Sequence, residues 1–289
     1  MPDMRATIRE LRLEPYVLEL ELNGLTVIPP DVHGFGMDRI DVMAEWILKR
    51  AAELTGSSFT LERGPAKRLG LPPGVERRGP LGGPTQFLLQ KLTTQHRIFR
   101  DLAVNPVSVA LMRHLIGPRA VRFSGHSCFI KWQGEFGYGP DLGLHADQTD
   151  VPLPWGRMAY TANTNLCLTD YTKAAGALAY VPGSHRKGTR PTADAATHAV
   201  AVEAVRGSLI VFHGATWHGA FPRLVPGMRL SMANYHRHAM VTSQQDIKGD
   251  FPRELADDCD NPRVFRELAG FDDVFPYKEP YEPIPVALD

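Results

Sequence analysis

Two histidines and an aspartate in this chain are spaced as ligands of one metal ion. His145 and Asp147 stand two positions apart, and residues two apart on a β-strand point to the same face. A second histidine, His218, would complete two nitrogens and one oxygen on one side of an octahedral metal. This facial arrangement with open positions is typical of non-haem Fe(II) oxygenases. We therefore predict that these three residues bind a catalytic metal ion.

An arginine downstream of the second histidine fits an anionic ligand. Residues 207–213 and 228–235 predict two strands joined by a turn rich in Pro and Gly. In such a hairpin, Arg229 would lie beside His218 as a cross-strand neighbour. Arg229 and Ser231 share one face of the second strand, and a guanidinium fork suits a carboxylate held through two hydrogen bonds. The pattern therefore predicts an anion site next to the metal.

Other histidines provide the alternatives to this ligand set. His236 and His238 repeat the spacing of two and are the rival metal pair, although no acidic residue stands close to them in the sequence. His213 lies in an apolar strand and is expected to pack in the core. His185 is expected to hold a turn. The glycine-rich approach to His145 favours the first set, because ligand sites are frequent where a loop meets the mouth of a sheet.

Composition narrows the classes of function. The 289 residues contain 32 Lys and Arg against 32 Asp and Glu, so no global basic field attracts nucleic acid or an anionic membrane. The three cysteines are widely spaced, which fits a reduced chain better than a disulfide framework. No signal peptide or membrane-spanning run is evident. We expect a cytoplasmic protein with a small-molecule substrate, whose oligomeric state the sequence does not indicate.

A local basic cluster interrupts this neutral composition. It lies in a long segment rich in Gly and Pro and consists of Arg63, Lys67, Arg68, Arg77 and Arg78. A solvated loop is the favoured interpretation, and a surface for a substrate linked to CoA or to a carrier is the alternative.

The order of predicted elements indicates a β-rich fold with flanking helices. Residues 38–54 predict an amphipathic helix, and residues 87–116 predict mostly helix with a break near Asn105. A turn at Gly24 precedes a short strand at 25–28. From residue 120 onward, strands alternate with turns without intervening helices, which favours an antiparallel jelly roll. These strands are expected at 121–124, 127–132, 160–168, 178–181, 200–205, 208–213 and 228–236.

We predict a single domain over residues 1–289. An N-terminal helical or lid region would extend to about residue 119, followed by the jelly-roll core at 120–240. A C-terminal extension at 241–289 would begin after the core and contain a short helix near 262–268.

Four segments together resemble the phytanoyl-CoA dioxygenase-like family of Fe(II)/2-oxoglutarate-dependent oxygenases. Besides H-A-D at 145–147 and the arginine eleven positions after His218, GALAYVPGSHRKG (176–188) is similar to the strand and turn after the family's first ligands. GSLIVFHGATWHG (207–219) is similar to its approach to the distal histidine, and the resemblance extends from NGLTVIP (23–29) to YHRH (235–238). It implies a double-stranded β-helix core, also called a jelly-roll or cupin-like core. It further implies that Arg229 pairs with the distal carboxylate of 2-oxoglutarate, and that Fe(II) is held by His145, Asp147 and His218.

The resemblance also suggests further contacts to the co-substrate. Family members often carry a hydroxyl two positions after the distal histidine, where this chain has Ala220. Ser231 is expected to supply that hydroxyl instead. Asn165 falls near a position that contacts the co-substrate in relatives, and Lys131 or Ser127 could also reach it.

The implied reaction is hydroxylation of an unactivated C–H bond in a small or medium-sized, partly apolar metabolite. O₂ would be consumed, and 2-oxoglutarate would become succinate and CO₂. Asp147 argues against a halogenase of this family, which lacks the carboxylate, whereas desaturation or epoxidation stays open. The alternatives are a cupin-like metalloenzyme that does not use 2-oxoglutarate and a non-catalytic ligand-binding protein. Walls of the substrate site are expected at Phe136, Tyr138, Trp155 and Trp217.

Overall fold

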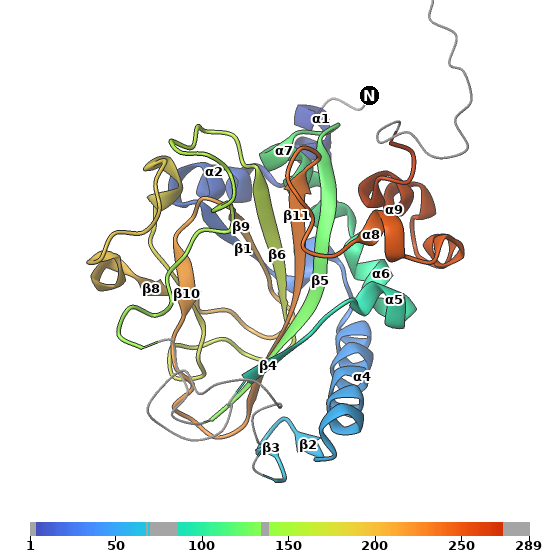
Figure 1. The fold of residues 1–289 in the computed structure, drawn as a ribbon, viewed down its shortest axis with the longest axis vertical. Helices are drawn as coiled ribbons and strands as arrows, with labels where there is room; N and C mark the ends of the chain where they lie inside the picture. The colour runs from blue at the N-terminus through green and yellow to red at the C-terminus, as the bar shows by residue number, and fades with distance from the viewer. Residues whose placement is uncertain (1–3, 68, 70–85, 134–138, 274–289) are drawn as a thin grey trace, which may run out of the picture.

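Two antiparallel sheets form the centre of the molecule (Figure 1). The computed structural model describes residues 4–67, 69, 86–133 and 139–273. In this part of the chain, the large sheet has the order β1, β9, β6, β11, β5, β4, and a smaller sheet has the order β10, β7, β8. The jelly-roll prediction is confirmed. The strands are β1 Leu25–Ile28, β2 Phe59–Thr60, β3 Gly64–Pro65, β4 Gln86–Leu89, β5 Val121–Trp132, β6 Thr161–Cys167, β7 Leu178–Tyr180, β8 Val200–Ala201, β9 Leu209–His213, β10 His218–Ala220 and β11 Met228–His238.

Helices cover the outer face of the large sheet. The helix α7 packs against β5, β6, β9 and β11, and α8 and α9 pack against β5. Among the described residues, no helix combines the length and apolar character needed to cross a membrane. The helices are α1 Met4–Glu10, α2 Glu14–Asn23, α3 Pro30–His33, α4 Met37–Thr55, α5 Leu92–Gln95, α6 Arg97–Ala103, α7 Pro106–Ile116, α8 Ile247–Asp250 and α9 Pro262–Ala269, with short 3₁₀ turns at Ser184–Arg186, Ala195–His198 and Arg253–Asp257.

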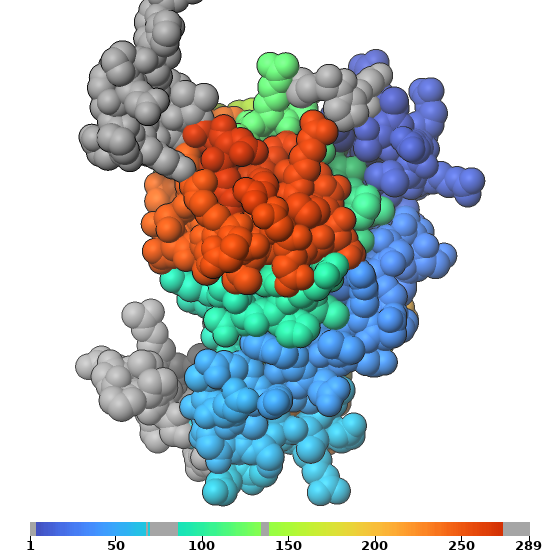
Figure 2. Space-filling model, turned by 90° about the vertical axis from the view of Figure 1, so that its right-hand side faces the viewer, coloured from blue at the N-terminus to red at the C-terminus, as the bar shows by residue number. Residues whose placement is uncertain are grey.

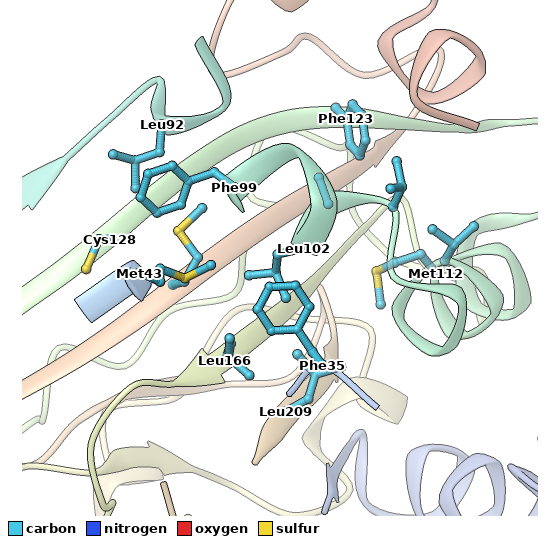
Figure 3. Packing of buried hydrophobic residues seen from close by; sticks show 14 of the residues in the cluster. Phe35, Met43, Leu92, Phe99, Leu102, Met112, Phe123, Cys128, Leu166 and Leu209 are labelled. Atoms are coloured by element: carbon cyan, nitrogen blue, oxygen red, sulfur yellow. The ribbon is translucent and has the colours of Figure 1, made fainter. Parts of the chain in front are cut away.

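The two faces of β11 have different surroundings because side chains alternate along a strand. Leu230 and Met232 point toward the helices and join a buried cluster with Phe99 of α6. Figure 3 shows Phe99 among the apolar side chains between α6 and the strands. Burial of a side chain of this size stabilises the fold by about 1.5–3 kcal/mol. Arg229 and Ser231 occupy the alternate positions and face a cavity between the two sheets.

Local signals placed most elements correctly. Helix α4 and strand β1 form where the sequence predicts them, and Gly24 makes the turn before β1 with a φ of 79°. Asn105 caps α7 by accepting hydrogen bonds from the backbone N–H groups of Val107 and Ser108. One expectation is corrected. The start of the predicted helical stretch is strand β4, which pairs with β5 at the edge of the large sheet.

The predicted hairpin between His218 and Arg229 is wrong. β10 pairs with β7 in the small sheet, where His218 lies opposite Tyr180. β11 pairs with β5 and β6 in the large sheet, where Arg229 lies opposite Lys131. The segment between β10 and β11 therefore crosses from one sheet to the other. His218 and Arg229 still line one cavity, because the two sheets enclose it from both sides.

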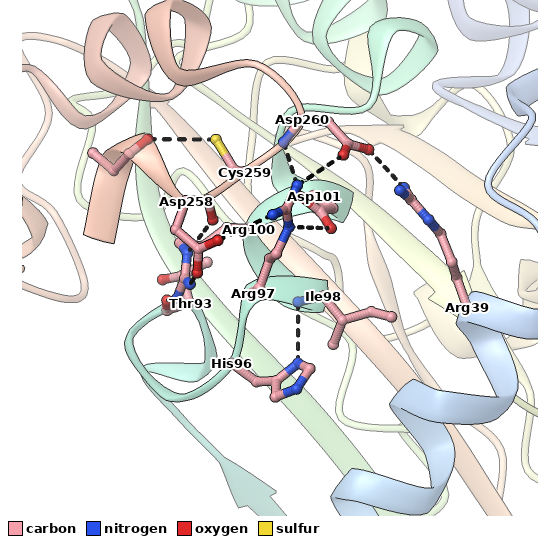
Figure 4. Close-up of polar contacts among 11 residues, drawn as sticks. Arg39, Thr93, His96, Arg97, Ile98, Arg100, Asp101, Asp258, Cys259 and Asp260 are labelled. Carbon is pink, nitrogen blue, oxygen red and sulfur yellow. Dashed lines mark hydrogen bonds and ion pairs between the residues drawn. The ribbon is translucent and has the colours of Figure 1, made fainter. Parts of the chain in front are cut away.

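Ion pairs fasten the segment after the jelly roll to the helical layer (Figure 4). Figure 2 shows this segment lying directly against the helices that precede the jelly roll. The buried guanidinium of Arg100 donates to the Asp258 carboxylate, to the backbone oxygen of Asp258 at 2.9 Å and to the backbone oxygen of Thr93 at 2.8 Å. Asp101 accepts a hydrogen bond from the backbone N–H of Asp260 at 2.9 Å. These contacts link α6 to the turn before α9, and so they hold the C-terminal segment against the core.

Replacing Arg100 with Met tests this attachment. The variant loses three hydrogen bonds at a buried position and leaves two backbone oxygens without their donor. We expect the free energy of unfolding in urea to fall by about 2–4 kcal/mol. Arg39→Met is the matched control, because its bond to Asp260 is exposed and such pairs contribute about 1 kcal/mol or less. Equal losses in the two variants would contradict the assigned role of Arg100.

Candidate metal centre

Backbone pairing brings the two predicted metal histidines together. The N–H of His145 donates to the carbonyl of His218, the N–H of His218 donates to the carbonyl of His145, and both distances are 2.9 Å. Gly219 permits this close approach, because a Cβ atom there would overlap the carbonyl oxygen of Leu142. Asp147 Oδ1 lies 3.6 Å from Nε2 of each histidine. One ligand atom from each of the three residues lies within 4.8 Å of the others, so the set can hold one ion.

Each imidazole is oriented by its second nitrogen. His145 Nδ1 lies 2.9 Å from the carbonyl oxygen of Gly143, and His218 Nδ1 lies 2.9 Å from that of Thr216. A carbonyl oxygen only accepts, so both Nδ1 atoms carry the proton and donate it. Both Nε2 lone pairs are then left for the space between the rings, as in metal-binding histidines with an ordering partner.

Asp147 is fixed on its side away from the histidines. Its backbone N–H donates to Gly214 at 2.8 Å, and its backbone oxygen accepts the hydroxyl of Tyr235 at 2.7 Å. Asn163 Nδ2 donates to Oδ2 at 3.3 Å. This contact occupies one carboxylate oxygen and leaves Oδ1 directed to the two imidazoles.

The charges around this group favour a cation. Burial raises the pKa of Asp147, but the histidine charges outweigh it, so the pKa is lowered. Burial lowers the pKa of His218 more than the Asp147 charge raises it. At His145, burial also lowers the pKa, but the hydrogen bond and charge of Asp147 outweigh it and the net shift is upward. Asp147 is therefore favoured in its ionised form and His218 in its neutral form, the forms in which these two side chains bind a metal ion.

The candidate metal ligands His145, Asp147 and His218, called the metal group below, line a cavity of about 510 Å³ between the sheets. Four predicted site residues besides the metal group lie on its wall: Arg229, Ser231, Asn165 and Ser127. The remaining described wall residues are Leu88, Gln90, Gly125, Phe129, Asn163, Tyr171, Leu178, Phe212, Gly219, Ala220, Ala233, Tyr235, Gln244 and Gln245. This volume lies within the range of about 300–1,000 Å³ that is usual for small-molecule sites.

The far end of the cavity carries a buried positive charge. Arg229 is 5% exposed, donates to the carbonyl of Gly176 at 2.6 Å, and lies 5.2 Å from the ring centre of Tyr171. No carboxylate among the described residues pairs with it, and its Nε has no hydrogen-bond partner there. Tyr171 and Ser231 both line the cavity beside the guanidinium, and each carries a hydroxyl. A buried cation without a counter-ion is suited to an anionic ligand.

Lys131 lies behind this end and not on the described cavity wall. Its side chain is buried, and Nζ donates to the carbonyl of Phe221 at 2.7 Å. Burial, reinforced by the charges of Arg229 and Arg223, lowers the pKa of Lys131 to about 7. A direct contact of Lys131 with a co-substrate remains a prediction, but its amine lies near the guanidinium groups of Arg229 and Arg223.

The lowered pKa of Lys131 predicts how stability depends on pH. Between about pH 7 and about pH 10, Lys131 is neutral in the folded state but protonated in the unfolded state. At this residue the unfolded state then binds more protons, so the contribution of Lys131 to the free energy of unfolding rises with pH over this window. Lys131→Met should lose that rise, as measured by urea unfolding at several pH values. Lys49→Met, at an exposed position of α4, should retain it; parallel curves for wild type and Lys131→Met would refute the assignment.

The predicted aromatic walls are corrected or lie outside the described residues. Trp155 and Trp217 are buried together in a small apolar cluster, and their indole N–H groups donate to the carbonyls of Val151 and Thr189. Trp217 directly precedes the predicted ligand His218 at the start of β10, so its side chain points to the opposite face. Phe136 and Tyr138 lie outside the described residues, as do Arg68, Arg77 and Arg78 of the basic cluster.

The rival histidine pair does not form a comparable group in the described structure. His236 points to the helical face of β11, where its ring is buried near Phe123 with 5.5 Å between ring centres. His238 lies beyond it and accepts a hydrogen bond from the backbone N–H of Met240 at 3.2 Å. His213 is buried in the core beside His185, as its apolar strand predicts.

Sequence reasoning missed several residues of the cavity. Asn163 could have been found, because it stands two positions before Asn165 on the same strand and must share its face. Tyr235 shares the cavity face with Ser231 by the same periodicity. Tyr171 and Gln245 lie in segments without regular periodicity, and no sequence signal indicated them.

The family profile described as phytanoyl-CoA dioxygenase (PhyH) matches residues 84–231, slightly more than half of the chain. The chain therefore belongs to the phytanoyl-CoA dioxygenase family. Among curated proteins, dioxygenase af480 of Aspergillus fumigatus is 34% identical over 123 residues, which cover 42% of this chain and 38% of that protein. An uncharacterized protein of Mycobacterium tuberculosis, Rv1501, is 33% identical over 135 residues, covering 46% of this chain and 48% of that protein. The matched segments thus span less than half of these relatives.

Solved structures share the fold at low sequence identity. HygX from Streptomyces hygroscopicus, crystallised with nickel and 2-oxoglutarate, is similar with a TM-score of 0.57 and 16% identity over 80% of this chain and 88% of that chain. SnoK, a carbocyclase from nogalamycin biosynthesis, gives a TM-score of 0.53 and 18% identity over 78% of this chain and 84% of that chain. At these identities the likeness supports the architecture and leaves the substrate undetermined.

Proposed function

We propose that this protein is a dioxygenase that uses Fe(II), 2-oxoglutarate and O₂ to oxidise a small molecule. One observation carries the proposal. A single cavity contains a His-Asp-His group suited to a metal and, at its far end, a buried arginine that pairs with no carboxylate among the described residues. Family membership and the HygX structure with bound 2-oxoglutarate support this assignment.

The residues of the chain fit these ligands. His145, Asp147 and His218 would hold Fe(II) from one side, because two Nε2 atoms and one carboxylate oxygen already converge there. Arg229 would bind the distal carboxylate of 2-oxoglutarate, with hydroxyls of Ser231 and Tyr171 beside it. A fork of fixed donors holds such a carboxylate more firmly than a point charge does.

The bound iron would supply the activation of O₂, with 2-oxoglutarate as the source of two electrons. The proposed overall reaction converts R–H, O₂ and 2-oxoglutarate into R–OH, succinate and CO₂, so one oxygen atom enters each organic product. The contribution of the protein is to orient the reactants and exclude water. Asn163 and Tyr235 serve this purpose by fixing Asp147, and the two sheets enclose the cavity.

Hydroxylation is the proposed outcome, and the fold by itself permits others. The solved structures with this architecture include a protein named a carbocyclase and one named an epimerase. Asp147 supplies the carboxylate oxygen of the facial group, which supports oxygen transfer to the substrate over halogenation.

The metal assignment predicts the effect of removing a ligand. His145→Ala, Asp147→Ala and His218→Ala should each weaken Fe(II) binding by at least tenfold, because each removes one of three convergent donors. Binding is measured by anaerobic titration, and succinate formation should fall to background. His238→Ala is the matched control, since it removes the partly exposed member of the rival pair. Full activity in any of the three variants would remove that residue from the ligand set.

The co-substrate assignment predicts a selective defect at Arg229. Arg229→Ala should raise the KM for 2-oxoglutarate by about 10- to 100-fold, because charge-assisted hydrogen bonds contribute about 1.5–3 kcal/mol. Arg229→Lys should restore only part of the affinity, since it keeps the charge but loses the fork. Anaerobic Fe(II) titration should give wild-type affinity in both variants.

This experiment also separates the alternative functions. If Arg229→Ala left turnover and 2-oxoglutarate affinity unchanged, a cupin-like metalloenzyme without this co-substrate would be the better assignment. A non-catalytic binding protein would give no visible charge-transfer band when Fe(II) and 2-oxoglutarate are added without oxygen to the wild-type protein.

A further inference from the structure

One wall of the cavity is unexplained by the metal or the co-substrate. It is formed by β4, β5 and the segment after β11, and includes Ser127, Gln244 and Gln245. The strand register places this wall level with the metal group. Tyr235 of β11 lies opposite Gly125 in β5 and opposite Asn163 in β6, and Asn163 contacts Asp147. The two flanking strands are about 10 Å apart, so the wall lies within the reach of a small substrate at the metal.

The backbone holds this wall in place. A register shift next to Tyr235 interrupts the pairing of β5 and β11, and Ser124 there binds the segment after β11 instead. The backbone N–H of Gln245 donates to the Ser124 oxygen at 2.9 Å, and that of Gln244 donates to Ser124 Oγ at 3.0 Å. A Cβ on Gly125 would lie 3.1 Å from Gln244 Oε1 and 3.4 Å from Gln245 Nε2. Glycine at this position therefore gives both amides room to lie over the strand.

Hydrogen bonds also fix which atoms the wall presents. Gln245 Oε1 accepts the backbone N–H of His126 at 3.2 Å, so Nε2 is the end that lies near Ser127 Oγ, at 3.4 Å. Because Ser127 accepts this bond, its own hydroxyl proton is available to another acceptor. The second proton of Nε2 is available as well. Ser127 and Gln245 both line the cavity, so each can donate one proton to a ligand there.

The same wall carries no formal charge. The ionisable groups on the described cavity lining are the metal group, Arg229 and the two tyrosines, Tyr171 and Tyr235. Leu88 and Phe129 lie opposite each other in β4 and β5, line the cavity, and are 38% and 37% exposed. An apolar surface therefore adjoins the two donors. A buried charge on a ligand would find no oppositely charged partner among the described residues of this wall.

We propose that Ser127 and Gln245 recognise an uncharged oxygen of the substrate, such as a hydroxyl, ether, carbonyl or amide oxygen. The apolar part of the same molecule lies on Leu88 and Phe129. This inference rests on the proposed function and specifies the substrate class for it. It identifies a neutral, oxygen-bearing apolar molecule, either free or as the acyl part of a thioester.

The test uses matched compounds with one carbon skeleton. Cyclic and linear alcohols, ketones and primary amides are compared with the corresponding carboxylates, amines and acyl-CoA thioesters, by measuring succinate formed above the substrate-free rate. We expect the neutral compounds to stimulate turnover and the carboxylates and amines to give at least tenfold less. Comparing a free amide with its acyl-CoA counterpart identifies which source of the neutral oxygen is used.

Variants then locate the recognition. With the best neutral compound, Ser127→Ala should lower kcat/KM by about three- to tenfold, and Gln245→Glu by more, because it replaces a donor with a negative acceptor. Anaerobic 2-oxoglutarate affinity should stay within about twofold in both variants. Ser243→Ala is the matched control, because Ser243 lies in the same segment after β11 as Gln245. Its hydroxyl donates to the backbone oxygen of Ser124 in β5, and it is not among the described residues of the cavity wall.

Two results would overturn the inference. One is stimulation by carboxylates or amines equal to that by the neutral compounds. The other is wild-type kcat/KM for the best neutral compound in both Ser127→Ala and Gln245→Glu. In either case the charge-transfer band of the wild-type protein would still be present. Its absence would instead mean that the proposed function itself has failed.

Discussion

The reciprocal backbone hydrogen bonds between His145 and His218 are the constraint on which the site depends. They join a loop to the edge of the small sheet and set the separation of two imidazoles that are far apart in the chain. The Nδ1 contacts then set the rotation of each ring, and Asn163 sets that of the carboxylate. Geometry of this kind is determined by the backbone before any ligand arrives, which is the condition for a preorganised site.

The large sheet serves two purposes through its alternating faces. Along β11, one set of side chains completes the apolar core under the helices, and the other set provides Arg229, Ser231 and Tyr235 to the cavity. A one-residue slip in register would exchange the two sets, placing a guanidinium in the core and Leu230 in the site. The packing of the helices therefore protects the chemistry of the opposite face as well as the stability of the fold.

The features that depend on residues close in the sequence could be predicted from the sequence. The features that depend on how the chain crosses between the two sheets could not. The spacing of His145 and Asp147, and that of Arg229 and Ser231, follows from the period of a strand and required no knowledge of topology. The pairing of β10 with β7 depends on the topology of the whole jelly roll. Local sequence signals instead indicated a hairpin with β11, which is incorrect. Trp217 was assigned to the cavity because it neighbours a ligand, although alternation places such a neighbour on the other face.

In the cavity wall formed by β4, β5 and the segment after β11, different atoms maintain the structure and contact the substrate. Hydrogen bonds of the backbone in β5 and in the segment after β11 hold the wall together. The surface that would contact a substrate consists of a few side chains. A change at the Ser127 side chain leaves the backbone hydrogen bond from Gln245 to Ser124 in place. Single substitutions at the side chains of this wall would therefore change the substrate that binds, while the residues that hold the metal stay the same.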